Sequence, residues 1–444
     1  MLNVGDLAVT RNSCVVCAPL GATLAFAGVR KGMTILHGSQ GCATYIRRYT
    51  ISHFREPLDA ASSSFTEESA VFGGRVNLRK AFENVVREYE PELVGVATTC
   101  LAETIGEDAA SARLALHDLI TDSSPLVATV STPSYRGDQR DGFRRALRAI
   151  VEASCPGEEA QPTGPTGPAG EGPIAVFPSM LSPADLRCLK DTFAAFGLDA
   201  ILVSDYSDTM DGGPWREERL LPEGGTPVSE LRRLVSARCA IELGSRTGSV
   251  STEGAASGAA YLSESFGAER LSLGLPIGVQ ATDAFMAELS RLSGTPIPQR
   301  IKSERERLLD SYIDGHKLLF GNRVLLYGDL DIREALSGFC AEVGMVPIVA
   351  KGEGRDFASI EKAATRADDE GHPVDLLIGN SKGYKTAKKL GAGLVRVGFP
   401  IHDRFGGPRV RLLSYGGTQE LFDRVVNAVI ERKQEDSDVG YTYY

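Results

Sequence analysis

The 444-residue sequence predicts an α/β fold of three doubly wound domains, each built around a parallel sheet. Apolar strand-like runs alternate with amphipathic helix-like runs, and this alternation starts afresh three times along the chain. The length also exceeds what a single hydrophobic core normally serves. An apolar content of 42% and a charged content of 24% are typical of a globular protein.

The predicted boundaries follow the points where the alternation restarts. The first domain is expected at residues 1–154, the second at 174–302 and the third, with a C-terminal helix, at 303–444. Between the first two, residues 155–173 are dominated by Pro and Gly and show no apolar period. This composition predicts a linker or an external loop.

Within the first domain, an apolar strand begins at Thr34 and is followed by the turn sequence Gly-Ser-Gln-Gly. A second strand is predicted at Leu93–Thr98, a helix after Glu103, and a third strand at Leu126–Ser131. These runs are short, rich in β-branched residues and bounded by turn residues, as buried strands of a parallel sheet are.

The second and third domains repeat this pattern. A helix after Ser182 has that serine as its N-cap, Pro183 at its first position and Gly197 as its stop. A polar helix at Ser303–Leu319 opens the third domain. The predicted strands of the two domains are Ile174–Ser179, Asp199–Ser204, Arg323–Asp329, Met345–Ala350 and Val374–Asn380.

Charge and composition exclude several functional classes. A net charge of −10 argues against binding to nucleic acid, which depends on clustered Lys and Arg. No apolar run approaches the roughly eighteen residues of a membrane span, and the N-terminus has no signal-peptide pattern. We therefore expect a cytoplasmic protein without a membrane partner. Its eight cysteines are then expected as thiols, which serve either a metal or redox site or simple core packing.

Four residues of the first domain stand out as candidates for a common site. Cys42 and Cys100 each follow a predicted strand, at the sheet edge where α/β proteins bind ligands. Cys17 ends the turn-like segment RNSCVVC, and Ser134 lies in VSTPSY. Cysteine thiolates hold iron–sulfur clusters. The wide spacing is not that of a compact ferredoxin motif, so spacing alone leaves a shared metal site and separate packing roles both open.

The remaining candidates are interpreted as structural. Cys188 and Cys340 lie on amphipathic helices and are expected in the core, whereas Cys155, at the start of the Pro/Gly-rich segment, is expected to be exposed. His37, at a strand end, is interpreted as a hydrogen-bonding residue. The arginine-rich segment YIRRYTISHFRE is interpreted as an interface helix, and no dinucleotide-binding G-x-G-x-x-G motif is present.

Longer segments resemble the β subunit of the nitrogenase catalytic component and its relatives. The resemblance is densest over residues 17–137 and 273–405, and its most specific segments are HGSQGCATYIRRYTISHFREP, SSFTEESAVFGG, ATTCLAETIGED, STPSY and GLPIGVQATDAF. It implies the nitrogenase component 1 architecture, with three Rossmann-like domains.

The resemblance also implies a cofactor and partners. Cys17, Cys42 and Cys100 match the β-side ligands of the P-cluster, an iron–sulfur cluster of the 8Fe-7S type shared with a homologous α-type subunit in an α2β2 heterotetramer. Ser134 matches a serine that ligates in the oxidised state. An ATP-dependent iron protein would deliver electrons, and Phe72 corresponds to part of its docking surface.

Two further residues carry weaker expectations. Glu56 matches a family cation site between β subunits. Cys14 forms a Cys-x-x-Cys pair with Cys17 that the nitrogenase β subunit lacks, and it is interpreted either as an alternative ligand or as a bystander. A simpler 4Fe-4S cluster is the alternative cofactor, since many scaffold chains of the family lack a cysteine at the position of Cys100.

The resemblance makes the chain an oxidoreductase subunit whose partner holds the catalytic site. Few residues precede Cys17, which favours a nitrogenase-like reductase acting on another small substrate, and reductive C–S cleavage of methylthio-alkanes is the specific hypothesis. The alternatives are the β-like chain of the scaffold on which the iron–molybdenum cofactor is assembled, the dinitrogen-reducing β subunit itself, and an iron-free binding protein of the same fold.

Overall fold

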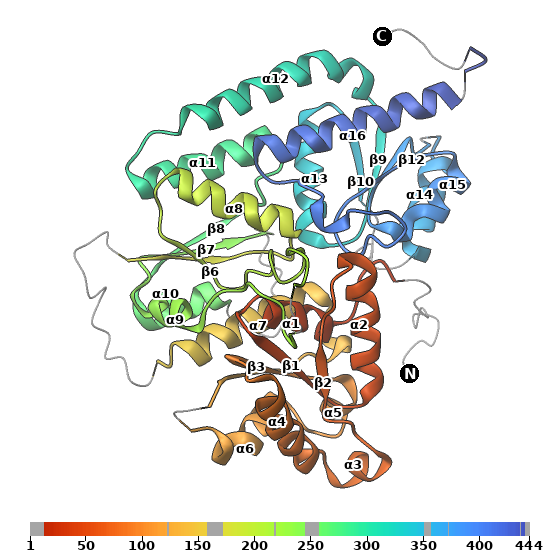
Figure 1. Ribbon diagram of the computed structural model, residues 1–444. Helices are drawn as coiled ribbons and strands as arrows, with labels where there is room; N and C mark the ends of the chain where they lie inside the picture. Colours follow the sequence, from red (N-terminus) through yellow and green to blue (C-terminus); the bar gives the residue numbers. More distant parts are fainter. Residues whose placement is uncertain are drawn as a thin grey trace. The chain divides into compact units, whose positions relative to one another are not determined.

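The computed structural model describes residues 13–121, 124–157, 172–216, 219–244, 257–349, 357–371, 373–435 and 437–439. Within them the chain forms three four-stranded sheets in which every strand pairs in parallel with its neighbours, with helices between the strands (Figure 1). The predicted α/β class with three parallel sheets is therefore confirmed. The Pro/Gly-rich segment at 155–173 lies mostly outside the described residues.

The three sheets share one topology. In each, the second strand lies at one edge and the order then runs first, third, fourth: β2-β1-β3-β4, β6-β5-β7-β8 and β10-β9-β11-β12. The connections turn in opposite directions on either side of the first and third strands, which makes the gap between those strands the topological switch point. Loops that follow these two strands form the crevice in which such sheets bind ligands.

The strands of the first sheet are β1 (Gly32–His37), β2 (Ala60–Ser62), β3 (Leu93–Thr98) and β4 (Leu126–Val130). Those of the second are β5 (Ile174–Phe177), β6 (Ala200–Leu202), β7 (Cys239–Leu243) and β8 (Glu269–Leu273). Those of the third are β9 (Arg323–Leu326), β10 (Val346–Val349), β11 (Leu376–Gly379) and β12 (Gly393–Arg396).

The helices that accompany the first sheet are α1 (Ala18–Ala27), α2 (Gln40–Phe54), α3 (Glu67–Phe72), α4 (Arg75–Tyr89), α5 (Cys100–Thr104), α6 (Ala109–Leu116) and α7 (Gln139–Ser154). The second sheet has α8 (Pro183–Ala195), α9 (Val228–Arg232) and α10 (Gly258–Phe266). The helices after it are α11 (Val279–Ser293), α12 (Gln299–Leu319), α13 (Leu330–Glu342), α14 (Phe357–Asp369), α15 (Tyr384–Leu390) and α16 (Ser414–Glu435).

Contacts divide the chain into two compact units. One comprises residues 16–273 and 292–294, and the other comprises residues 1–15, 274–291 and 295–444. The first unit contains the first two sheets and the second contains the third. The domain boundaries derived from the sequence stay a prediction. Among the described residues, no helix is long and apolar enough to cross a membrane.

The helix α1 is buried along its whole length and packs against α7 with almost no side chains between them. A β-carbon at Gly21 would lie 1.7 Å from the backbone oxygen of Gln139, and one at Gly142 would lie 1.9 Å from that of Ala18. Only glycine permits backbones to approach this closely. The start of α1 is thereby held rigidly against the start of α7.

Candidate functional site

The three cysteines singled out in the first domain all lie at the beginning of a helix. Cys17 is the N-cap of α1, Cys42 lies in the first turn of α2, and Cys100 is the first residue of α5. Helix N-termini present unpaired backbone N–H groups and a partial positive charge, which favours thiolates. The loops after β1 and β3 supply Cys42 and Cys100, and these strands flank the switch point of the first sheet.

Backbone contacts fix the position of Cys17. Its backbone pairs with that of Asp138 in an isolated antiparallel bridge. The preceding residue, Val16, donates its N–H to the side-chain oxygen of Gln139 at 2.7 Å and accepts from the Gln139 N–H at 3.0 Å. Because α1 and α7 are locked together, the Cys17 thiol has a defined place next to the loop that carries Ser134.

The turn before Cys42 is fixed by Thr99, the residue that directly follows β3. Gly38 has a φ of +156°, and a β-carbon there would lie 1.9 Å from the hydroxyl oxygen of Thr99. Glycine is therefore required at this position by the packing of the two cysteine-bearing turns on each other. At Gly41, by contrast, a β-carbon would meet no atom of the described residues within 4 Å.

Ser134 and Cys100 are in direct contact. Ser134 begins a 3-10 turn after β4 (Ser134–Arg136), and its backbone N–H donates to the sulfur of Cys100 at 3.2 Å. Both residues are exposed. The thiol of Cys100 thus already carries one of the N–H···S hydrogen bonds that tune iron–sulfur sites.

The three thiols interact electrostatically. The pKa of Cys17 is raised to about 11, mainly by burial; the Leu20 N–H acts to lower it, and the nearby Cys42 and Cys100 add to the increase. The pKa of Cys42 is also raised, mainly by burial. A hydrogen bond with the Ser39 side chain opposes this effect, and the nearby Cys100 adds to it. Burial and neighbouring like charges both disfavour the thiolate form, which is why the pKa values of Cys17 and Cys42 are raised.

The three thiols lie near one another without forming a site for a single metal ion among the described residues. Among the described residues, no three His, Cys, Asp or Glu side chains converge closely enough to hold one metal ion. Cys42 and Cys100 are nevertheless near enough to Cys17 to raise its pKa. Three separated thiolates, each binding a different iron, are what an iron–sulfur cluster requires.

Phe72 lies in an exposed apolar patch. It ends α3, and 83% of it is exposed; Val71 and Val76 are each 76% exposed. We call these three residues the apolar patch. Between them, Gly73 and Gly74 connect α3 to α4. Large exposed apolar side chains that gather on a surface mark interaction sites.

Glu56 lies apart from the cysteines. It follows Arg55, which ends α2 in the left-handed conformation, and it lines a cavity of about 70 Å³ with Trp215 and Arg219. Burial raises the pKa of Glu56, and the neighbouring Asp211 raises it further. These contacts say nothing of a cation, so the cation site stays a prediction.

Cys14 is buried in a different core from the one near Cys17. Its side chain packs in a hydrophobic cluster with Leu325, Leu377 and Ala387, and its backbone oxygen accepts from the Asn380 side chain at 2.6 Å. This environment favours a packing role for Cys14 over the alternative of a cluster ligand.

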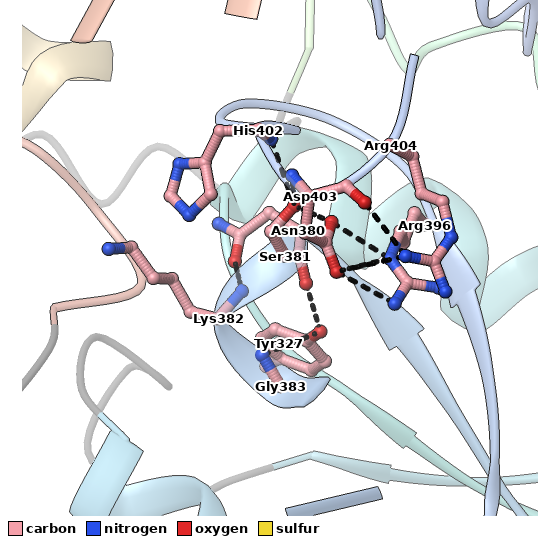
Figure 2. Close-up of polar contacts among 9 residues, drawn as sticks. All are labelled: Tyr327, Asn380, Ser381, Lys382, Gly383, Arg396, His402, Asp403 and Arg404. Atoms are coloured by element: carbon pink, nitrogen blue, oxygen red, sulfur yellow. Dashed lines mark hydrogen bonds and ion pairs between the residues drawn. The ribbon is translucent and has the colours of Figure 1, made fainter. Parts of the chain in front are cut away.

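Asn380, which donates to the Cys14 backbone oxygen, belongs to a polar network at the carboxyl end of the third sheet (Figure 2). Arg396 binds Asp403 through two guanidinium nitrogens, at 2.9 and 2.7 Å, and Asp403 also accepts from Ser381. Tyr327 donates to the Asn380 backbone oxygen. In Figure 2 the side chains of Lys382 and His402 point away from the Arg396–Asp403 pair. The network is a structural brace of the loops after β11 and β12.

Two expectations about individual residues have clear outcomes. Cys155 is fully buried, and its thiol donates to the backbone oxygen of Leu231. The expectation that it is exposed was wrong, because α7 continues to Ser154 and carries Cys155 into the interior. His37 is a hydrogen-bonding residue, as predicted. Its partner Glu107 was missed, since 70 residues separate them and only the pairing of β1 with β3 brings them together.

Comparison with known proteins identifies close relatives. The family model described as "Nitrogenase component 1 type Oxidoreductase" matches residues 17–430. The nitrogenase molybdenum-iron protein beta chain of Methanococcus maripaludis is 32% identical, covering 96% of each chain, and that of Clostridium pasteurianum is 33% identical, covering 96% of this chain and 94% of the relative. A solved structure titled "Nitrogenase Cp1 at pH 6.5" superposes with a TM-score of 0.86 at 31% identity, covering 100% of this chain and 98% of the other.

Proposed function

This chain belongs to the nitrogenase component 1 type oxidoreductases, as a β-type subunit, and we propose that it holds one half of an iron–sulfur cluster that relays electrons to a partner subunit. Cys17, Cys42 and Cys100 would be its ligands on this side. The observation that carries the proposal is that three mutually interacting thiols occupy three helix N-termini at one sheet edge.

The chain's own residues would support such a cluster in three ways. The helix N-termini stabilise the thiolate charges. The Ser134 N–H donates to the Cys100 sulfur, and the Ser134 hydroxyl is proposed as a further ligand or hydrogen-bond donor. The cluster itself would supply one-electron transfer. An 8Fe-7S cluster of the P-cluster type is proposed, with a 4Fe-4S cluster as the alternative.

Three ligands leave a cluster of this size incompletely bound, which supports a site shared with a homologous α-type subunit. Exposure of Cys100 and Ser134 is consistent with such an interface. The exposed side of α2, which includes Tyr45 (44% exposed) and Ile51 (40% exposed), extends it. We propose an α2β2 heterotetramer with the catalytic cofactor on the α-type partner.

The apolar patch around Phe72 is the proposed docking surface for an ATP-dependent iron protein. A large exposed aromatic next to exposed aliphatic side chains is typical of the anchor of an interface. The patch lies on α3 and the first turn of α4, within the domain that carries the cysteines. Electrons would therefore enter the domain that holds the proposed cluster.

For the substrate, we propose methylthio-alkanes, cleaved as R–S–CH3 + 2 e⁻ + 2 H⁺ → R–H + CH3SH. Dinitrogen is the second candidate substrate. It is supported by the relatives named above, which are chains of nitrogenase molybdenum-iron proteins. The test is to purify the chain anaerobically with its partner and iron protein, and to supply each substrate with ATP and a reductant. Methanethiol without ammonia supports the first, and ammonia supports the second. Neither product, from an iron-loaded complex, would favour the assembly scaffold.

A further inference from the structure

A hydrogen-bonded chain runs from the apolar patch to the cysteine-bearing turns. Glu107, in the loop after α5, accepts the backbone N–H of Gly74 at 2.7 Å with one carboxylate oxygen. Its other oxygen lies 2.8 Å from the Nε2 atom of His37 at the end of β1. Gly74 is two residues after Phe72, so this carboxylate joins the patch segment to the switch point of the first sheet.

The chain continues from His37 into the turn that leads to Cys42. The Nδ1 atom of His37 lies 3.0 Å from the hydroxyl of Ser63, and that hydroxyl accepts the Gly38 N–H at 2.9 Å. A carboxylate only accepts, so Nε2 carries the ring proton and Nδ1 accepts from Ser63. The pKa of His37 is lowered, because the effect of burial exceeds the opposing effect of the Glu107 carboxylate. This direction agrees with a neutral ring.

The same histidine also contacts the turn of Cys100. Its backbone oxygen accepts from the N–H of Thr99 at 3.0 Å and from the Thr99 hydroxyl at 3.1 Å. Thr99 is the N-cap of the helix that Cys100 begins. Both cysteine-bearing turns are thus positioned through His37.

A parallel apolar contact reinforces the connection. The ring of Phe65 packs edge-on against His37, with centroids 4.9 Å apart, and a β-carbon at Gly74 would lie 2.0 Å from that ring. A cavity of about 260 Å³, lined by His37, Glu107 and Arg75, leaves room for the carboxylate to shift. The His37–Glu107 pair is therefore tightly packed against Phe65 on one side, and on the other side it borders a cavity into which it can move.

Resting on the proposed function, we propose that Glu107 is a positioning residue that couples the docking segment of Phe72 to the turns of Cys42 and Cys100. When a partner displaces Gly73 and Gly74, the carboxylate follows the Gly74 N–H and moves His37. Since His37 holds both turns, docking would change the surroundings of the thiolates before electrons arrive.

The test uses Glu107→Ala, which removes both hydrogen bonds, and Glu107→Gln, which preserves them if the histidine changes tautomer. Glu342→Ala is the matched control, because Glu342 also accepts two backbone N–H groups, from Val279 and Gln280, but lies in the other unit. His37→Phe, which keeps the packing on Phe65, serves if Glu107→Ala fails to fold.

The first readout is amide hydrogen exchange of the chain without iron. Glu107→Ala is expected to speed exchange about tenfold in the peptides containing Gly38 and Thr99, since two partly buried hydrogen bonds to a carboxylate are lost. Glu107→Gln should restore the parent rate, and Glu342→Ala should leave these peptides unchanged. Unchanged exchange in Glu107→Ala would overturn the proposal.

The second readout is the EPR spectrum of the iron-loaded complex before and after adding the iron protein with a nonhydrolysable ATP analogue. The parent and Glu107→Gln should show a change on docking that Glu107→Ala lacks. A docking-dependent change that persists in Glu107→Ala overturns the coupling alone and leaves the proposed function intact. A parent that holds iron but shows no change on docking also overturns the coupling alone. A parent that holds no iron overturns the proposed electron relay.

Discussion

The backbone N–H of Ser134 donates a hydrogen bond to the sulfur of Cys100 across 3.2 Å. The two residues follow neighbouring strands, β4 and β3, and are 34 positions apart in the sequence. The bond involves the backbone of Ser134, so its hydroxyl stays available for another role. This separation of backbone and side chain makes the two contributions testable independently.

Ser134→Ala keeps the N–H···S bond and removes only the hydroxyl. Because the proposed ligands of the reduced state are the cysteines, the variant is expected to retain the parent's iron content. Its oxidised EPR signal should change, because the hydroxyl can no longer bind iron. A variant with the parent's oxidised spectrum would assign Ser134 a backbone role only, and a loss of iron would show that the hydroxyl is needed in every state.

The raised pKa of Cys17 makes the stability of the iron-free chain depend on pH. The folded pKa of about 11 exceeds the ordinary value of 9.0. The contribution of the protonated thiol is therefore complete below pH 9 and is lost as the pH rises towards 11. Cys17→Ser should flatten this part of the profile, seen as the difference in Tm between variant and parent from pH 8 to pH 11. Parallel profiles would contradict the assigned pKa.

Phe72 offers a test of docking that leaves the fold intact. Because 83% of the residue is exposed, Phe72→Ala should barely change Tm, while the KM for the iron protein rises about tenfold, as for an interface anchor. Phe405→Ala is the matched control, since Phe405 is also 83% exposed and lies in the other unit. An equal KM for the iron protein in Phe72→Ala and Phe405→Ala would show that the docking surface lies elsewhere.

Much of the fold could be predicted because its strands are buried apolar runs. β3 was predicted with its observed bounds, as six consecutive buried residues between turn signals. The strand β2 was missed because Ala60–Ser62 is too short and too small in its side chains to show a pattern. β8 was missed because it is an edge strand, whose Glu269 and Arg270 are exposed.

The candidate site was predictable in part for the same reason. Cys42 and Cys100 are recognisable because they follow strands, and parallel strands place their following loops at one edge. Cys17 had no such signal, since its position depends on the glycine contacts between α1 and α7. The Glu107–His37 pair was not predictable, because a hydrogen bond between residues so far apart leaves no local pattern.

The most direct test of the central claim is iron quantitation with an EPR redox titration on the anaerobically purified complex of this chain with its partner, compared with Cys42→Ala and the control Cys188→Ala. We expect about eight irons per interface, with a cluster that is EPR-silent when reduced and paramagnetic on oxidation. Cys42→Ala should lose this signal and Cys188→Ala should keep it. A parent without iron, or a Cys42→Ala variant with the parent's iron and spectrum, would contradict the claim that these cysteines hold a cluster.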